Sequence, residues 1–268
     1  MSQSIATPAR AADPSRLVVL LCALAQIGAA LLPALGIGTP VGDRSDTVRT
    51  LITSAGWAFS IWGALYLGSL VFALLQFTAA GRGSSLFAAL RWPAAGAFLG
   101  NALWATWVQL GAIDAVSTII IFASLASILT AYRRIVDWTG GFTAAERWGA
   151  VLPLSALAAW LTAAAIVNVA ASLRYYGVDA GPDSAPLISA AVVVIGGVLA
   201  AAALARGKGN PPFALVFLWA LAAIYAAGGQ QSVLVAGATA IAALLVLVGA
   251  SFGWRDGGAR HWPGRTRA

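Results

Sequence analysis

The chain contains 268 residues, of which 60% are hydrophobic and only 9% are charged. Ordinary soluble domains carry about 25% charged residues, and a water-soluble globule has no interior large enough for this much apolar surface. The net charge is +7 and the mean hydropathy is +0.85. These values exclude a normal soluble domain and indicate a protein that lies in a membrane.

Eight apolar segments follow one another along the chain. At 1.5 Å per residue, about 20 residues cross a hydrocarbon core roughly 30 Å thick. Lipid offers no partner for a free backbone N–H or C=O, so each segment is predicted to be a helix. The expected fold is an all-α polytopic membrane protein with about eight transmembrane helices. The segments are residues 17–35, 56–78, 92–110, 115–132, 148–173, 187–205, 212–228 and 232–252.

The basic residues are distributed unequally between the two sides of the predicted bundle. With eight crossings, thirteen of the 16 Lys and Arg residues fall on one side, and only Arg44, Arg49 and Arg174 fall on the other. Cytoplasmic loops retain Lys and Arg. We therefore predict a multi-pass protein of the cell membrane with both termini in the cytoplasm, where residues 1–16 form a tail and residues 253–268 a second, basic tail. Because the basic residues are spread over short loops and tails, they indicate orientation in the lipid bilayer and not nucleic-acid binding.

Few residues are suited to acid–base or metal chemistry. The chain has one cysteine, Cys22, and one histidine, His261, in an Arg-rich tail where we expect it to be solvated. One thiol cannot form a disulfide within the chain, and zinc or haem sites usually need several His or Cys ligands. No predicted span carries an ionisable residue at mid-depth, where proton and ion pathways normally place one. The sequence therefore predicts no catalytic residues and no metal site.

Ten of the 11 tryptophans fall into two groups. One group lies close to the predicted cytoplasmic ends of segments and fits the aromatic belt of membrane interfaces; it consists of Trp92, Trp138, Trp148, Trp254 and Trp262. The second group lies inside the second, third and fifth segments. In the second segment, Phe59, Trp62 and Tyr66 are spaced i, i+3 and i+7, so we expect them to share one face of a helix.

Two asparagines accompany these tryptophans inside the predicted spans. Asn101 precedes Trp104 by three residues, and Asn168 follows Trp160 in the fifth segment. An amide within a bilayer needs polar partners, so it faces either a neighbouring helix or a cavity. Both interpretations stay open at this point. Gly96 and Gly100 form a pair of small residues four apart, which allows a second helix to approach closely.

The residues of the second, third and fifth segments resemble a known family. The run GWAFSIWGALY at residues 56–66 is similar to the second-helix signature of the tryptophan-rich sensory proteins, the TspO/MBR or translocator-protein family. Asn101-Ala102-Leu103-Trp104 resembles the third-helix Asn-x-x-Trp of that family, and Pro153, Trp160 and Asn168 resemble its fifth helix. The chain departs from the pattern at residues 54–55, where Ser-Ala replaces the usual Pro-Pro, and in the closer spacing of Trp57 and Trp62.

The resemblance implies a five-helix core over residues 17–173, followed by a three-helix extension over residues 174–252. It further implies binding of a porphyrin, haem or another flat hydrophobic ligand, with no required cofactor, in an aromatic cavity covered by residues 36–55. The site residues that it implies are Trp57, Phe59, Trp62, Tyr66, Asn101, Trp104, Trp160 and Asn168.

The leading hypothesis is thus a membrane sensor or binding protein. One alternative is a carrier for a small hydrophobic solute, in which the last three segments complete a path. Another is a porphyrin-degrading enzyme, which would have to use photochemistry or indole oxidation because acid and base groups are missing. The sequence leaves open the identity of the ligand and the oligomeric state, for which a homodimer is one option.

Overall fold

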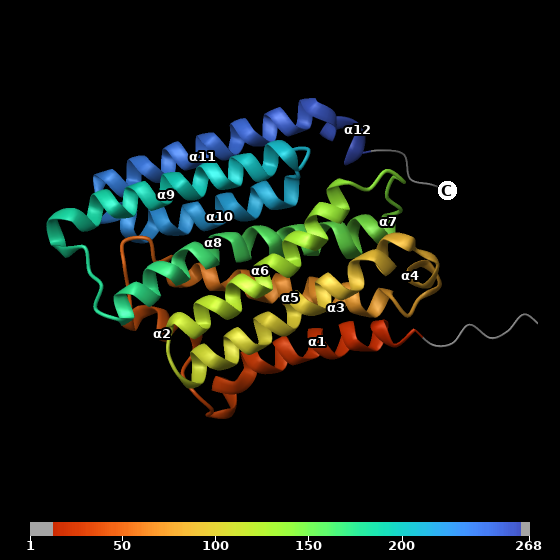
Figure 1. Ribbon diagram of the computed structural model, residues 1–268, viewed down its shortest axis with the longest axis horizontal. Helices are drawn as coiled ribbons and strands as arrows, with labels where there is room; N and C mark the ends of the chain where they lie inside the picture. Colours follow the sequence, from red (N-terminus) through yellow and green to blue (C-terminus); the bar gives the residue numbers. More distant parts are fainter. Residues whose placement is uncertain (1–12, 264–268) are drawn as a thin grey trace, which may run out of the picture.

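The computed structural model describes residues 13–263, and within this range it contains helices and no strand. Eight long helices of the described chain run side by side along the long axis of the molecule (Figure 1). The all-helical prediction is therefore confirmed for these residues. The long helices are α1 (Pro14–Leu31), α3 (Ile61–Leu75), α5 (Ser85–Leu110), α6 (Ala115–Val136), α8 (Leu152–Tyr175), α9 (Gly181–Arg206), α10 (Pro211–Ala227) and α11 (Val233–Gly253).

Short helical elements lie in the connections between the long helices. Four of them are α2 (Val41–Thr47), α4 (Ala79–Gly83), α7 (Ala144–Glu146) and α12 (Ala259–His261). Three 3₁₀ turns are η1 (Leu32–Leu35), η2 (Gly56–Ser60) and η4 (Gly228–Gln230), and two π-helical turns are η3 (Arg147–Val151) and η5 (Trp254–Gly258). The element η2 leads directly into α3, and η3 leads directly into α8.

Within residues 13–263, 7 helical stretches are long and apolar enough to cross a membrane. They contain every long helix except α5. This helix carries three buried polar side chains, those of Arg91, Asn101 and Gln109. Because α1 and α6 both pack along α5, these polar groups are covered by protein.

The long helices form a ring of five and a group of three. In the ring, α1 packs on α3 and α5, α5 packs on α6, α6 packs on α8, and α8 returns to α3. In the group of three, α10 and α9 both pack on α11. The main contact between the ring and the group is made by α10 on α8, although α9 is the helix that directly follows α8 in the chain.

Small residues allow the closest helix pairs to form. A Cβ atom at Gly197 of α9 would lie 2.7 Å from the Cα atom of Ala242 in α11, so only glycine fits there. A Cβ atom at Gly100 of α5 would lie 2.8 Å from the Cβ atom of Ser124 in α6. Backbone approach at small residues is a main source of helix association in membranes. The close approach predicted at Gly96 and Gly100 is therefore confirmed.

The helix α1 begins and α12 ends at the same end of the bundle, together with α4 and α7 (right in Figure 1). We call this end the termini end. The element α2 and the α8–α9 connection lie at the opposite end, which we call the α2 end. The two ends of the described chain lie at the same end of the bundle, which agrees with an even number of membrane-crossing helices. Arg10, Arg265 and Arg267, and the greater part of the predicted N-terminal tail, lie outside the described residues.

The helix α5 begins at Ser85, seven residues before the predicted segment, and so includes Arg91. The Arg91 side chain is only 5% exposed. Its Nε donates a hydrogen bond to Gln76 Oε1 at 2.7 Å, and its Nη1 pairs with the Asp13 carboxylate. Hydrogen bonds from Ser15, together with the positive charge of Arg91, lower the pKa of Asp13 below its ordinary value. The paired charge can therefore lie buried within the helix, where an unpaired charge would be costly.

The chain after α11 folds back onto the termini end, which corrects the prediction of a solvated His261 and an interfacial Trp262. Trp262 is only 7% exposed and stacks on Phe142 with ring centroids 6.0 Å apart. Its Nε1 donates to the carbonyl oxygen of Lys208 at 2.5 Å. His261 is partly buried, with its Nε2 3.2 Å from the Ile135 carbonyl oxygen. A buried indole needs a polar partner, and the turn before α10 supplies one.

Candidate functional site

A largely apolar cavity of about 60 Å³ lies at the α2 end, between α8 and α10 and beneath α2. We call it the aromatic cavity. Residues of α2, η2, α5, α8 and α10 contribute to its wall, so it is built by both the five-helix ring and the three-helix group. The lining residues are Val41, Ser45, Ser54, Phe59, Trp104, Ile113, Trp160, Ala163, Ala164, Val167, Asn168, Ala171, Ala220 and Ile224.

One face of α8 supplies the largest part of the wall. Trp160, Asn168 and the residues between them that line the cavity recur three or four apart, and such residues share one face of a helix. The alanines on this face, Ala163, Ala164 and Ala171, leave space that larger side chains would fill. The cavity therefore exists because α8 alternates large and small residues along its inner face.

Asn168 joins α8 to its neighbours through hydrogen bonds at the cavity wall. Its Oδ1 accepts from Trp104 Nε1 at 2.9 Å, and its Nδ2 donates to Thr118 Oγ1 at 2.8 Å and to Ser117 Oγ at 3.1 Å. These bonds fix the Trp104 ring against the cavity. The sequence left two interpretations open for this amide, contact with a neighbouring helix and contact with a cavity. Asn168 does both, because it bridges helices and also lines the cavity.

Trp62 and Tyr66 lie behind the aromatic cavity and not in its wall. Their rings stack at 5.2 Å between centroids, and the Trp62 ring meets Trp160 edge to face at 5.9 Å. Phe59, by contrast, lines the cavity. Phe59 belongs to the 3₁₀ turn η2 and α3 begins at Ile61, so the three residues do not all lie in one α-helix, and of the three only Phe59 reaches the cavity wall.

Asn101 and Trp57 are the two predicted site residues furthest from this arrangement. Asn101 Nδ2 donates to Gln26 Oε1 at 3.1 Å and so joins α5 to α1. The Tyr66 hydroxyl lies next to the Asn101 amide. Trp57 is 47% exposed, and its ring meets Trp219 of α10 edge to face at 4.8 Å. Neither Asn101 nor Trp57 is among the residues that line the aromatic cavity.

The contribution of α10 is the main feature that sequence reasoning missed. Ala220 and Ile224 line the cavity, and Trp219 Nε1 donates to the Ala58 carbonyl oxygen at 3.3 Å. The backbone N–H of Ala55 also donates to the Ala223 carbonyl oxygen at 3.0 Å. The available signal was Trp219 itself, a tryptophan inside an apolar segment that the family signature did not explain.

Besides the indole N–H groups of Trp104 and Trp160, the polar side-chain groups of the cavity wall are two hydroxyls and one amide. Ser45 comes from α2, Ser54 from the segment before η2, and Asn168 from α8; the described lining contains no ionisable side chain. Within residues 13–263, no group of three or more His, Cys, Asp or Glu residues could hold a metal ion. The arrangement is suited to holding an apolar molecule by shape and ring contact, with a few hydrogen bonds to orient it.

One of three comparisons with known proteins identifies the family of the chain. The family model described as TSPO-like protein matches residues 16–252, a range that extends over all eight long helices. The match therefore includes the three C-terminal helices, to which the resemblance read from the motifs did not extend. No curated protein and no solved structure matches the chain significantly. The chain belongs to the TSPO-like protein family and is a multi-pass helical protein of the membrane.

Proposed function

We propose that this protein is a membrane sensor or binding protein that holds a flat hydrophobic ligand, such as a porphyrin, in the aromatic cavity. The observation that carries the proposal is the convergence of Phe59, Trp104 and Trp160, from three separate elements, on one apolar cavity. Aromatic rings offer large rigid faces, and ring stacking contributes about 0.5–1.5 kcal/mol per pair beyond the burial of area. The family membership supports the same site, since the matched range contains all three residues.

The volume of the cavity requires that its cover opens when such a ligand binds. The cavity measures about 60 Å³, whereas sites for drug-sized ligands measure roughly 300–1,000 Å³. The cover is residues 40–54, which include α2 and two lining serines. We call residues 40–54 the lid. Its flanking residues are held by backbone hydrogen bonds, from Thr39 N to Gln109 O at 2.9 Å and from Ala55 N to Ala223 O at 3.0 Å. The lid can thus move between two fixed points.

The lining also bears on which porphyrins would bind. It contains no His, Cys or Met side chain that could serve as an axial ligand to iron. The single histidine, His261, lies in α12 at the termini end, opposite the cavity. A porphyrin would therefore be held by stacking and shape. We expect metal-free protoporphyrin and haem to bind about equally well, with micromolar affinity, which corresponds to about −8 kcal/mol.

Titration of detergent-purified protein with protoporphyrin, followed by quenching of tryptophan fluorescence, tests the proposal. Trp104→Leu and Trp160→Leu should each weaken binding about tenfold, because each loses roughly 1.4 kcal/mol of ring contact. Trp254→Leu is the matched control, since Trp254 lies at the termini end and is 39% exposed. If all three variants bind like the unmodified protein, the ligand does not occupy this cavity.

We also propose how the bundle lies in the membrane. The helix α5 forms an eighth span shielded by α1 and α6, the five-helix ring corresponds to residues 17–173, and both termini lie in the cytoplasm with the α2 end outside. The charge distribution supports this orientation, since Arg44, Arg49 and Arg174 are the basic residues of the α2 end. Because Cys22 is the only cysteine, a Cys22→Ala background allows clean labelling. Cysteines at Asp43 and Asp183 should react from outside and one at Asp137 from inside; the reverse would overturn the orientation.

A further inference from the structure

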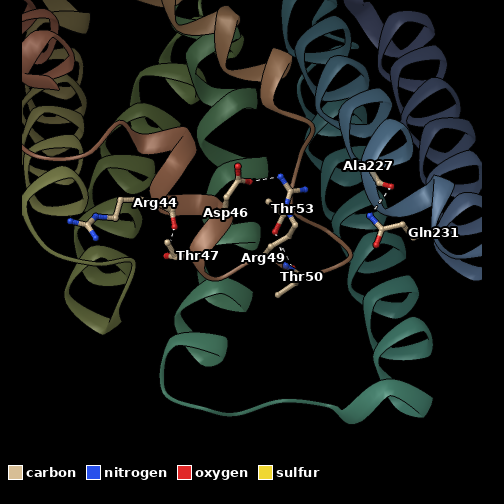
Figure 2. A network of polar contacts seen from close by, with 8 residues as sticks. All are labelled: Arg44, Asp46, Thr47, Arg49, Thr50, Thr53, Ala227 and Gln231. Carbon is tan, nitrogen blue, oxygen red and sulfur yellow. Dashed lines mark hydrogen bonds and ion pairs between the residues drawn. The ribbon is translucent and has the colours of Figure 1, made fainter. Parts of the chain in front are cut away.

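A second, larger pocket lies at the α2 end between the five-helix ring and the three-helix group. We call it the interface pocket. Its volume is about 510 Å³, which falls in the range of small-molecule sites. Figure 2 shows Arg49 and Thr50 on one side of this region and Gln231 on the other, with the α8–α9 connection passing below them. Residues 49–52, the end of α8, residues 178–182 and the first turns of α9 complete its wall.

The interface pocket and the aromatic cavity are linked by a third cavity, which shares lining residues with both. Between them lies a small apolar cavity of about 20 Å³, which we call the neck. The neck shares Ile52 and Val192 with the interface pocket. It shares four residues with the aromatic cavity, namely Ala163, Val167, Ala220 and Ile224. Each space therefore shares part of its wall with the next.

Ile52 is placed to close this route. It is only 2% exposed, and it lines both the interface pocket and the neck. It also belongs to the lid, so a movement of the lid that enlarges the aromatic cavity would withdraw Ile52 from the neck. The opposite wall of the neck is lined by small or flexible apolar residues, among them Gly196 and Ala163.

The rim of the interface pocket carries two arginines and one aspartate, whereas its depth is largely apolar. Arg49 and Arg174 line it, each paired with a neighbouring carboxylate, Asp46 and Asp179 respectively. The four side chains are between 41% and 58% exposed. Exposed pairs of this kind contribute only about 0–1 kcal/mol, so an arginine can exchange its partner for a ligand at small cost. The rim thus suits a hydrophobic molecule that carries a carboxylate at its edge.

We infer that the interface pocket is the site where the ligand first binds, that it takes hydrophobic molecules with an acidic group, and that Ile52 controls passage to the aromatic cavity. The inference rests on the proposed function. It assigns a role to the three C-terminal helices, because α9 and α10 form one wall of the route. A pocket of about 460 Å³ at the termini end shares no lining residue with the aromatic cavity or the neck, so the proposed route opens at the α2 end and supports reversible binding.

Stopped-flow quenching with protoporphyrin and with its dimethyl ester tests the route and its charge preference. Ile52→Trp fills the neck and should slow association and dissociation of both probes about tenfold, equivalent to about 1.4 kcal/mol in the barrier, while the equilibrium constant stays nearly unchanged. Ile52→Ala should speed both steps, and this variant tests the route if Ile52→Trp prevents folding. Ile195→Trp is the control, since Ile195 lies on α9 and is 58% exposed. Unchanged rates in both Ile52 variants would overturn the route.

The charge preference is read from the same experiment. Arg49→Gln and Arg174→Gln should slow association of the acid several-fold and leave the ester unaffected, because rim charges act mainly on association rates. Equal effects on acid and ester would overturn the preference for an acidic ligand.

A thiol-labelling experiment separates failure of the route from failure of the proposed function. In a Cys22→Ala background, Val167→Cys places a thiol in the wall shared by the neck and the aromatic cavity. Its labelling by an apolar maleimide should slow about tenfold when Ile52→Trp is added, and not when Ile195→Trp is added. If Ile52→Trp slows labelling but porphyrin does not bind, the proposed ligand class is wrong and the route stands. If Ile52→Trp does not slow labelling, the route is wrong even if porphyrin binds.

Discussion

The termini end of the bundle and the lid region at the α2 end are held by different kinds of polar contact. At the termini end, hydrogen bonds join elements that are far apart in the chain: Ser84 Oγ donates to Glu146 Oε1 at 2.5 Å, and Lys208 Nζ donates to the Val136 carbonyl oxygen at 2.5 Å. At the α2 end, the network in Figure 2 joins residues three or four apart, as in the pairs Arg49 with Asp46 and Gln231 with Ala227.

This difference indicates which end can open. A hydrogen bond between distant elements fixes one helix relative to another, whereas a bond within one turn fixes only its own segment. The aromatic cavity, the neck and the interface pocket all lie at the α2 end, next to a lid whose own side-chain bonds are local. Bonds to distant elements are found there at the flanks of the lid and at Asn168. The molecule thus combines one cross-linked end with one end whose lid rests mainly on apolar packing. Segments with few long-range contacts open at low free-energy cost.

The largest expected effect comes from breaking the termini end. Trp262→Ala removes a buried ring that stacks on Phe142 and donates to Lys208. Truncation of a buried tryptophan costs about 3–5 kcal/mol, so thermal unfolding in detergent should shift strongly downward. Porphyrin affinity of the folded protein should stay the same. Trp254→Ala is the matched control, and an equal loss of stability there would contradict the packing role of Trp262.

The next effect concerns the lid. A Cβ atom at Gly228 would collide with the Leu51 carbonyl oxygen, whereas one at Gly237 would meet no atom within 4 Å. Gly228→Ala should therefore push the lid away from α10 and cost about 1–3 kcal/mol, as overpacking usually does. The same variant should accelerate porphyrin association. Gly237→Ala should leave both the unfolding midpoint and the rate of porphyrin association unchanged. Faster association in Gly237→Ala would mean that movement of the lid is not the cause of the faster association in Gly228→Ala.

A smaller effect separates the two amides. Asn168 lines the aromatic cavity, whereas Asn101 pairs with Gln26 away from it. Interhelical hydrogen bonds in membrane proteins average about 0.6 kcal/mol, so both Asn168→Leu and Asn101→Leu should fold. Porphyrin titration should show weaker binding for Asn168→Leu only. Equal weakening by the two variants would mean that both residues act through the packing of the bundle.

The smallest effect is expected from the surface pairs of the α2 end. Asp46→Asn breaks the pair with Arg49, whose side chain is 41% exposed. Exposed pairs contribute about 0–1 kcal/mol, so the unfolding midpoint should scarcely move. Removal of the competing carboxylate should instead speed association of acidic ligands at low salt. A large loss of stability would show that this pair holds the lid, and the contrast between the two ends would be lost.

Several features of the fold could be predicted from the sequence because they depend on local chemistry. Long apolar runs specify helices in lipid, and Gly96 and Gly100 predicted a close helix contact, although not that α6 makes it. The start of α5 could not be predicted, since Arg91 is tolerated only through its pairing with Asp13 and Gln76, which are distant in the chain. The burial of Trp262 likewise depends on Phe142 and Lys208.

The candidate site was predictable in part. Trp104, Trp160 and Asn168 line the cavity, and their spacing on helices placed them in the membrane interior. Phe59 also lines it, from the 3₁₀ turn η2 and not from the α-helix that the spacing predicted. The wall from α10 could not be derived from the motifs, since it depends on which helix of the C-terminal three packs against α8.

Hydrogen–deuterium exchange with and without protoporphyrin tests directly whether the ligand binds beneath the lid in the aromatic cavity. Saturating ligand should change the exchange of backbone amides in the lid, residues 40–54, and in the facing part of α10. Amides of residues 144–151 and 259–262 at the termini end should exchange as before. A response confined to the termini end, or no response in the lid at saturation, would contradict the claim that the ligand binds beneath the lid in the aromatic cavity.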